Sequence, residues 1–254
     1  MTQDDRSQPN EFGVIPEDEV LDKDLITRGR DELEDAWFIL MTNAHEVTGF
    51  EDSLNASPAN WLQFWNDDSV YPPHRFREPS RLLHNFLASA ITLVDHTRNH
   101  MKSAYGEHSF FAEYQQAVND RFGAPLPQFV HGLRNFTLHY SLPLGMARLS
   151  LDPENPHPHT FLLTKTRLVQ GFKWSATARA FLDQQEEEFP VSKLVTAYMD
   201  VVNSLQHWRA EQVPVLFNRA MLAQHGPHSQ IARASRGDPD QQNRVVEKKP
   251  SDGA

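Results

Sequence analysis

Residues 129–143, which read FVHGLRNFTLHYSLP, decide how the whole chain is interpreted. Side chains suited to a buried face recur in and just before this stretch at helical spacing, at Leu126, Phe129, Val130, Leu133, Phe136, Thr137 and Tyr140. A repeat of three and four residues is typical of a helix that packs one face against a core. Leu142 precedes Pro143, and a residue before proline avoids the helical conformation, so the helix is predicted to end near Ser141.

The opposite face of this predicted helix is polar. It carries His131, Arg134, Asn135 and His139. Asn135 and His139 lie four residues apart and are therefore neighbours on a helix surface. Arg134 and His139 are separated by about 140° around the helix and about 7.5 Å along it, so one helix places them poorly for joint action. Arg134, Asn135 and His139 are the candidate catalytic residues, because they combine a permanent cation with a base that titrates near neutral pH.

Helical patterns account for most of the remaining chain. We expect helices from about Asp18 to Gly49, directly after Pro58, from Pro79 to about Tyr105, from Ser109 to about Phe122, from Ser175 to about Phe189, and from Ser192 to about Gln224 with a bend near Pro214. The helix that begins at Pro79 is apolar over most of its circumference, which predicts a central position. Residues 71–79, YPPHRFREP, are expected to form an extended loop.

After Pro143 the period of the apolar pattern changes from 3.6 to 2. Met146–Leu151 and Thr160–Val169 are predicted to be strands, joined by the turn-rich sequence DPENPHPH, in which His157 and His159 should face solvent. The expected fold class is therefore mainly α, a helical bundle with a small two-stranded β insertion at about residues 145–170.

The ends of the chain differ from its middle in composition. Residues 1–16 and 226–254 are polar, contain proline and lack periodicity, and we predict that both are disordered. Residues 17–225 are then predicted to form a single helical domain. The sequence has no apolar run of membrane-spanning length, no apolar leader and no cysteine, so we expect a cytoplasmic protein without a membrane span or disulfides.

The net charge of −10 is spread unevenly along the chain. Residues 1–69 hold 4 Lys and Arg against 17 Asp and Glu, whereas residues 70–180 hold 12 against 7 and have a net charge of +5. The candidate residues thus lie in the basic part of an acidic protein. A local positive field suits a polyanion such as RNA. The alternative is that the acidic ends simply keep the protein soluble.

A second pair of polar residues has the spacing of metal ligands on a helix. His96 and His100 lie four residues apart, but the sequence offers no obvious third ligand. We therefore predict neither a metal nor a cofactor.

The motif RNFTLH, residues 134–139, resembles the signature of the HEPN superfamily, which is an arginine, a polar residue and then a histidine near a helix end. The mostly apolar segment LLHNFLASAITLVDHTR, residues 82–98, is similar to the partner helix of that fold. The resemblance covers about residues 80–142 and implies a HEPN-like core. The Arg-to-His spacing by itself is unspecific, since it recurs at Arg77 to His84 and at Arg219 to His225.

The resemblance implies a metal-independent endoribonuclease of a toxin or defence system that acts on RNA as a homodimer, with an antitoxin-like protein as a further partner. It also implies an alternative, since some members of the superfamily are non-catalytic modules that bind nucleotides or proteins. Two other interpretations stay open from the residues themselves. The polar face is also what an ordinary surface helix shows, and the acidic N-terminal helix is equally suited to a protein that acts only through interactions.

Overall fold

The computed structural model describes residues 23–66, 72–143, 146–150, 152, 154 and 159–225. Its main compact unit is Leu21–Glu211, and the last described turns of the final helix belong to a second unit. The predicted disordered segments, 1–16 and 226–254, lie outside the described residues. The division into one domain and two tails therefore stays a prediction.

The described elements are, in chain order, α1 (Lys23–Asn55), α2 (Pro58–Asn66), the 3-10 helix η2 (Pro72–Phe76), α3 (Arg77–Tyr105), α4 (Ser109–Phe122), α5 (Pro125–His139), β1 (Met146–Leu149), β2 (His159–Thr164), α6 (Lys165–Val169), α7 (Ala176–Gln184), β3 (Glu188–Pro190) and α8 (Val191–His225). This mainly helical fold with one small antiparallel sheet confirms the predicted fold class. Within the described ranges, no helix combines the length and hydrophobicity needed to cross a bilayer.

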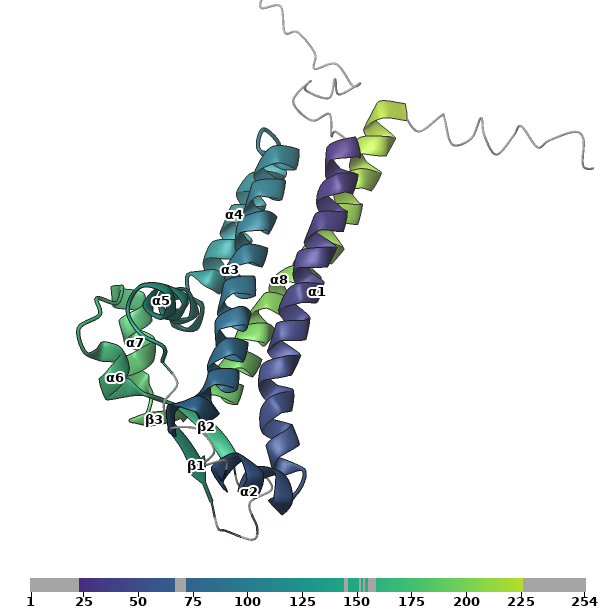
Figure 1. The fold of residues 1–254 in the computed structure, drawn as a ribbon. Coiled ribbons are helices and arrows are strands. Elements are labelled where there is room, and N and C mark those ends of the chain that lie inside the picture. Colours follow the sequence, from purple (N-terminus) through teal and green to yellow (C-terminus); the bar gives the residue numbers. More distant parts are fainter. Residues whose placement is uncertain are drawn as a thin grey trace, which may run out of the picture. The chain divides into compact units, whose positions relative to one another are not determined.

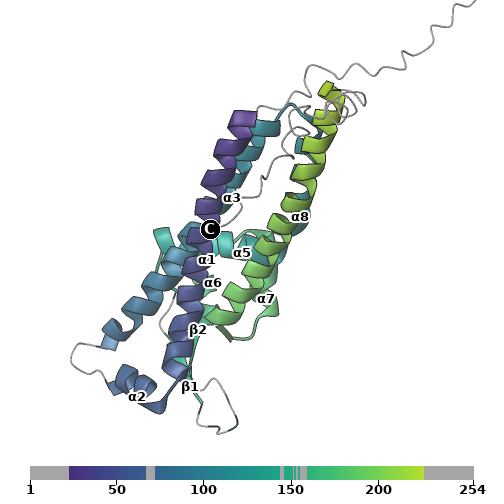
Figure 2. The same cartoon turned by 90° about the vertical axis from the view of Figure 1, so that its right-hand side faces the viewer.

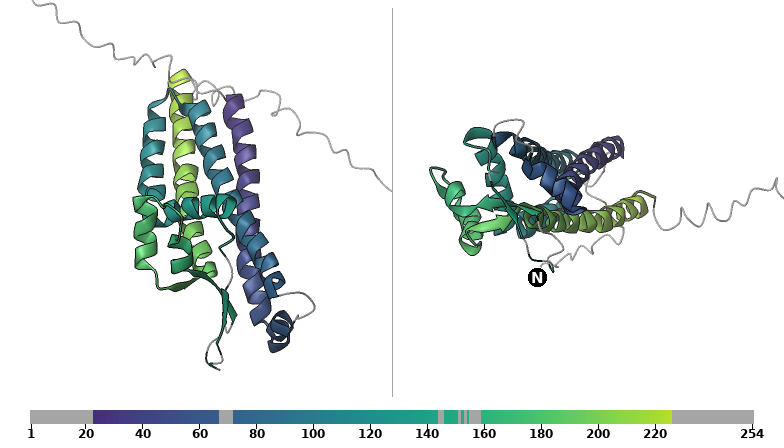
Figure 3. Two further views of the ribbon diagram at one scale, coloured as in Figure 1. Left: turned by 60° about the vertical axis from the view of Figure 1, so that its left-hand side comes forward. Right: turned by 60° about the horizontal axis from the view of Figure 1, so that its bottom comes forward.

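Figures 1 and 2 show that α1, α3 and the part of α8 before Gln212 have roughly parallel axes, with α1 running opposite to α3 and α8. In Figure 3, α5 lies across these helices, with α7 beside it. Twelve residues of α3 are buried, among them Phe86, Ala90 and Leu93, so the predicted central position of this helix is confirmed. The bend expected at Pro214, which lies inside α8, stays a prediction.

The first helix ends later in the sequence than the apolar pattern predicted. Gly49 does not end it, and α1 continues to Asn55. The added turns are held by tertiary contacts, because Leu54 and Glu51 are both buried, at 7% exposure each. The predicted start at Asp18 lies outside the described residues.

The segment before α3 was also predicted wrongly. Its residues Pro72–Phe76 form a 3-10 helix and not an extended loop, and α3 begins at Arg77. Pro79 is therefore the third residue of α3. Proline is tolerated there because the amide groups of a first helical turn have no partner within the helix.

The sheet has three strands and not two. In the order β1-β2-β3, both pairs are antiparallel, with Met146 opposite Leu162 and Leu163 opposite Phe189. Residues 165–169, predicted as strand, form α6, while Glu188 and Phe189, predicted as the end of a helix, belong to β3. The helix predicted to reach Phe189 ends at Gln184 as α7.

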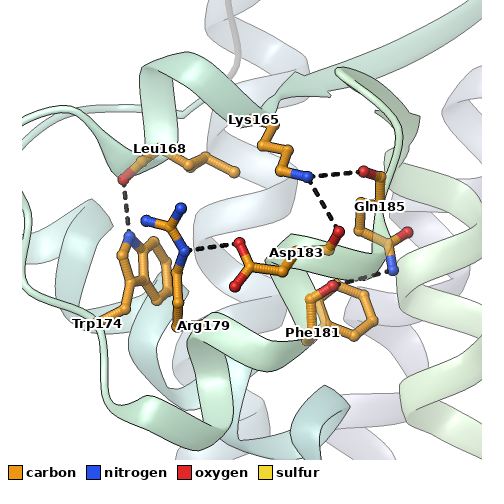
Figure 4. Close-up of polar contacts among 7 residues, drawn as sticks. All are labelled: Lys165, Leu168, Trp174, Arg179, Phe181, Asp183 and Gln185. Carbon is orange, nitrogen blue, oxygen red and sulfur yellow. Dashed lines mark hydrogen bonds and ion pairs between the residues drawn. The ribbon is translucent and has the colours of Figure 1, made fainter.

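Lys165 explains why α7 stops early (Figure 4). Its ammonium group donates to the backbone carbonyls of Asp183 and Gln185, at 3.2 and 3.0 Å. Carbonyl groups at the C-terminal end of a helix accept no hydrogen bond from within the helix, so a cation is a suitable partner for them. The chain then turns into β3, where the side chain of Phe189 is buried.

His159 was expected to face solvent, and that expectation is wrong. The side chain is fully buried among the rings of Phe64, Trp65 and Phe161. In the described part of the chain, neither ring nitrogen has a hydrogen-bond partner. Burial without a partner disfavours the charged imidazolium and lowers the pKa of His159 to about 4. His157 lies outside the described residues.

Replacing Leu133 with alanine should lower the free energy of unfolding by about 2–5 kcal/mol, because this side chain is fully buried on α5 and its loss leaves a cavity. Chemical denaturation measures the effect. Leu62→Ala is the matched control, since Leu62 on α2 is 44% exposed and should cost much less. Equal losses in the two variants would contradict the placement of α5 in the core.

Acid should destabilise the protein through His159. Between an ordinary histidine pKa of 6.5 and the folded value of about 4, the unfolded chain binds a proton that the folded chain does not. The free energy of unfolding therefore falls as the pH drops through this window, by up to about 3 kcal/mol. Denaturation at pH 7 and pH 4.5 should show a smaller loss for His159→Phe than for the wild type. His45→Asn, at an exposed histidine of α1, should behave like the wild type.

Candidate functional site

The candidate residues lie on α5, whose apolar face forms as the sequence predicted. Phe129, Val130, Leu133 and Phe136 are all fully buried. Tyr140, which was placed on the same face, is instead 52% exposed. The reason is that α5 ends at His139 and Tyr140 is the capping residue, with a backbone outside the helical range.

Aromatic packing fixes the position of α5. The ring of Phe129 stacks on Phe181 of α7 and on Trp174, with centroid distances of 4.7 and 5.1 Å. The indole of Trp174 also lies against Gly132, where a Cβ atom would come within 2.7 Å of the ring. The same indole donates to the carbonyl oxygen of Leu168 at 2.8 Å (Figure 4). These contacts leave α5 little freedom to shift, and they require glycine at position 132.

Arg134 is half-buried, and one hydrogen bond orients its guanidinium group. Its Nη1 donates to Oδ1 of Asn135 at 3.2 Å. Its Nε is buried and has no partner among the described residues. A buried guanidinium N–H without an acceptor lowers the stability of the protein. A ligand or a water molecule therefore usually accepts a hydrogen bond from such a group. Arg134 and Asn135 are therefore joined by a hydrogen bond, and the Nε–H group of Arg134 can still donate to a ligand.

His139 occupies a different environment from Arg134. Its side chain is exposed in the last turn of α5. Hydrogen bonds from His139 to Asn135 or to Arg134 are absent from the described contacts, although Asn135 and His139 were expected to be neighbours. The structure joins Arg134 and Asn135 by a hydrogen bond, whereas His139, which lies four residues after Asn135 on the same helix, is exposed.

The chain that follows His139 is tied down by residues about thirty positions later. The guanidinium of Arg167 donates to the carbonyl oxygen of Leu142 at 2.9 Å, and the hydroxyl of Tyr140 donates to the carbonyl oxygen of Gln170 at 2.8 Å. Gly171 permits this second contact, because its φ is +76° and a Cβ atom there would lie 2.1 Å from the Tyr140 hydroxyl. The exit of α5 is therefore held in place.

Arg167 is a residue that sequence reasoning missed. Its guanidinium contacts the carbonyl oxygen of Leu142, which lies three residues after the end of α5 at His139. Its sequence neighbours gave no signal, since it was assigned to a strand. The contact depends on a pairing across 25 residues, which no local pattern reveals.

Several apolar side chains in and directly after the last turn of α5 are exposed. Leu138 is 42% exposed, Leu142 51% and Met146 38%. Together with Tyr140 these residues form what we call the α5-exit patch. Several large apolar side chains exposed close together in sequence favour contact with another molecule.

The pair His96 and His100 shows no sign of a metal site. His100 packs against Gly29 of α1, where a Cβ atom would lie 1.7 Å from its Nδ1. Burial lowers the pKa of His100, and the nearby charge of Arg209 adds to that effect. Over the part of the chain that the structure describes, no three His, Asp or Glu side chains gather closely enough to hold a metal ion.

Comparison of the chain with protein-family models, with curated proteins and with solved structures gives no match.

Proposed function

We propose that this protein is a HEPN-like endoribonuclease in which Arg134, Asn135 and His139 are the catalytic residues and two copies of the chain form the active unit. The observation that carries the proposal is the state of Arg134, a half-buried guanidinium held by Asn135 with an unpaired Nε. A phosphate oxygen is a suitable acceptor for such a donor.

The proposed chemistry assigns a role to each side chain, and that of Asn135 is to hold the guanidinium of Arg134. His139 as a neutral base removes the proton from a ribose 2′-OH, and the 2′ oxygen attacks the adjacent phosphorus. The bond from phosphorus to the 5′ oxygen breaks, and that oxygen takes a proton from an imidazolium. Arg134 stabilises the negative charge that develops at phosphorus. The products are a 2′,3′-cyclic phosphate and a 5′-hydroxyl, and the base and the cation are both supplied by side chains.

Two copies of the chain meet a geometric need of this mechanism. Among the described contacts, His139 makes no hydrogen bond to Arg134 or Asn135 of its own chain, and the reaction requires both a base and an acid. A two-fold axis near the end of α5 would bring two copies of His139 together, one for each role. The α5-exit patch provides apolar surface for such a contact, and Arg167 adds positive charge beside it for the RNA backbone.

His139→Ala and Arg134→Ala should each lower the cleavage rate of RNA by on the order of a hundred-fold or more, through loss of the base and of charge stabilisation. Cleavage by the wild type should proceed in EDTA and leave a 2′,3′-cyclic phosphate, and an oligonucleotide with 2′-deoxyribose at the cleaved position should resist it. Both variants should keep the wild-type melting temperature.

The controls for this assay are His45→Ala and Arg30→Ala, at exposed residues of α1. Activity that survives both α5 variants, or that disappears with EDTA, contradicts the mechanism. A well-folded wild type that cleaves no RNA would favour the alternative of a non-catalytic module that binds nucleotides or proteins.

The protein should be a dimer at tens of micromolar in light scattering, and Leu142→Glu should convert it to a monomer, because a buried unpaired carboxylate is costly at an apolar contact. The monomer should also lose activity. Ile39→Glu is the matched control, since Ile39 is likewise 51% exposed but lies on α1. A monomeric wild type, or an active Leu142→Glu monomer, would exclude the shared site.

A further inference from the structure

A pocket of about 510 Å³ lies between α3, α4, α5 and α8, inside the compact unit Leu21–Glu211. Gln128 and His131 of α5 line it, but Arg134, Asn135 and His139 do not. It is therefore a site separate from the proposed ribonuclease residues. Its volume is within the range of pockets that hold small organic molecules.

The pocket explains why several core-type residues are only half-buried. Its walls include five apolar side chains of intermediate exposure, which are Ile91, Val94, Phe111, Val118 and Phe122. Val118 is an apolar residue of α4 and follows the buried residues Tyr114 and Ala117. It is not fully covered because it borders this space. An apolar ligand in the pocket would bury the remaining exposed surface of these side chains, which is favourable in free energy.

One polar atom in the wall lacks a partner. Thr97 of α3 lines the pocket and is only 2% exposed, and its hydroxyl makes no hydrogen bond within the described residues. Threonine in a helix commonly donates to the carbonyl four residues earlier, as Thr92 does to Ala88 at 3.0 Å and Thr137 does to Leu133 at 2.8 Å. The hydroxyl of Thr97 does not, so its hydrogen-bonding capacity is unused among the described residues.

The charged side chains of the lining, Asp95 and Arg98, are paired with each other, and exposed His131 is a further titratable side chain. The carboxylate of Asp95 accepts from the guanidinium of Arg98 at 2.9 Å at the rim. Burial raises the pKa of Tyr114 to about 12, so its hydroxyl is neutral at physiological pH. Amides of Gln115, Asn119 and Gln206 supply further neutral hydrogen-bonding groups. A charged ligand would lose hydration here, and Asp95 and Arg98 are already paired with each other.

We propose that this pocket binds an uncharged, mainly apolar small molecule that carries at least one hydrogen-bonding group, which pairs with the hydroxyl of Thr97. Aromatic walls and an unpaired buried hydroxyl select for a flat ring system with a single polar substituent. This site is independent of RNA cleavage, so either proposal can fail without the other.

The test uses the full-length protein and the neutral fluorescent probe 1-aminoanthracene, with anthracene-1-carboxylate as its anionic counterpart. The neutral probe should bind saturably, with one site per chain, and the anion should bind at least ten-fold more weakly. Val118→Trp fills the pocket and should abolish binding of the neutral probe. Leu62→Trp, at an exposed leucine that does not line the pocket, is the matched control and should bind normally.

Thr97→Val provides a second variant that keeps the shape of the wall. It should weaken binding of 1-aminoanthracene by about 3- to 10-fold, the effect of one neutral hydrogen bond, without lowering the melting temperature, because no internal hydrogen bond is lost. A drop in melting temperature would show that the hydroxyl already has a partner, and would overturn its assigned role.

Three results would overturn the proposal as a whole. These are no saturable binding to the wild type, unchanged binding to Val118→Trp, and equal affinity for the anionic probe. Probe affinity that falls steadily as the protein concentration rises would also overturn it, because a second copy of the chain would then occupy the pocket.

Discussion

The buried end of α1 is the constraint on which the rest of the fold depends. The carboxylate of Glu51 accepts from the backbone N–H of Phe161 in β2 at 3.1 Å and from the hydroxyl of Ser192 in α8 at 3.0 Å. One turn later, the amide of Asn55 pairs with both the N–H and the carbonyl of His159, at 2.8 and 2.9 Å. A helix thus satisfies peptide groups of a strand from the sheet, and leaving such buried groups unpaired would cost about 1–3 kcal/mol each. These contacts link α1, the sheet and α8.

The candidate site depends on that link through a chain of contacts. With β2 in place, β3 pairs beside it and directs Phe189 into the core, where its ring contacts Phe129 of α5 at 6.1 Å between centroids. Phe181 of α7 and Trp174, which precedes α7, also stack on Phe129. The polar face of α5 is consequently presented by a rigid support, which is what a site on a helix needs if its side chains are to be pre-organised.

Buried polar atoms without partners occur at three places of different character. In the described part of the chain, the imidazole of His159, beside the equally unpartnered indole of Trp65, lies in an aromatic cluster, Thr97 lines a pocket, and Nε of Arg134 belongs to the candidate site. Such groups cost stability, and each needs a reason. The first is a neutral ring that packs as an apolar group. The other two have space or donor capacity for a ligand, and for that reason the proposals rest on them.

The sequence by itself determined the helices and the buried face of α5, because their periodicity depends only on neighbours within a turn or two. It also singled out Arg134, Asn135 and His139 as polar residues of that helix. Only the tertiary structure decided that α1 passes Gly49, that residues 165–169 are helical and that His159 is buried. These outcomes rest on Glu51 meeting Ser192, on Lys165 meeting the end of α7, and on aromatic rings from α2 closing over β2. The partners are distant in sequence, so no local pattern contains them.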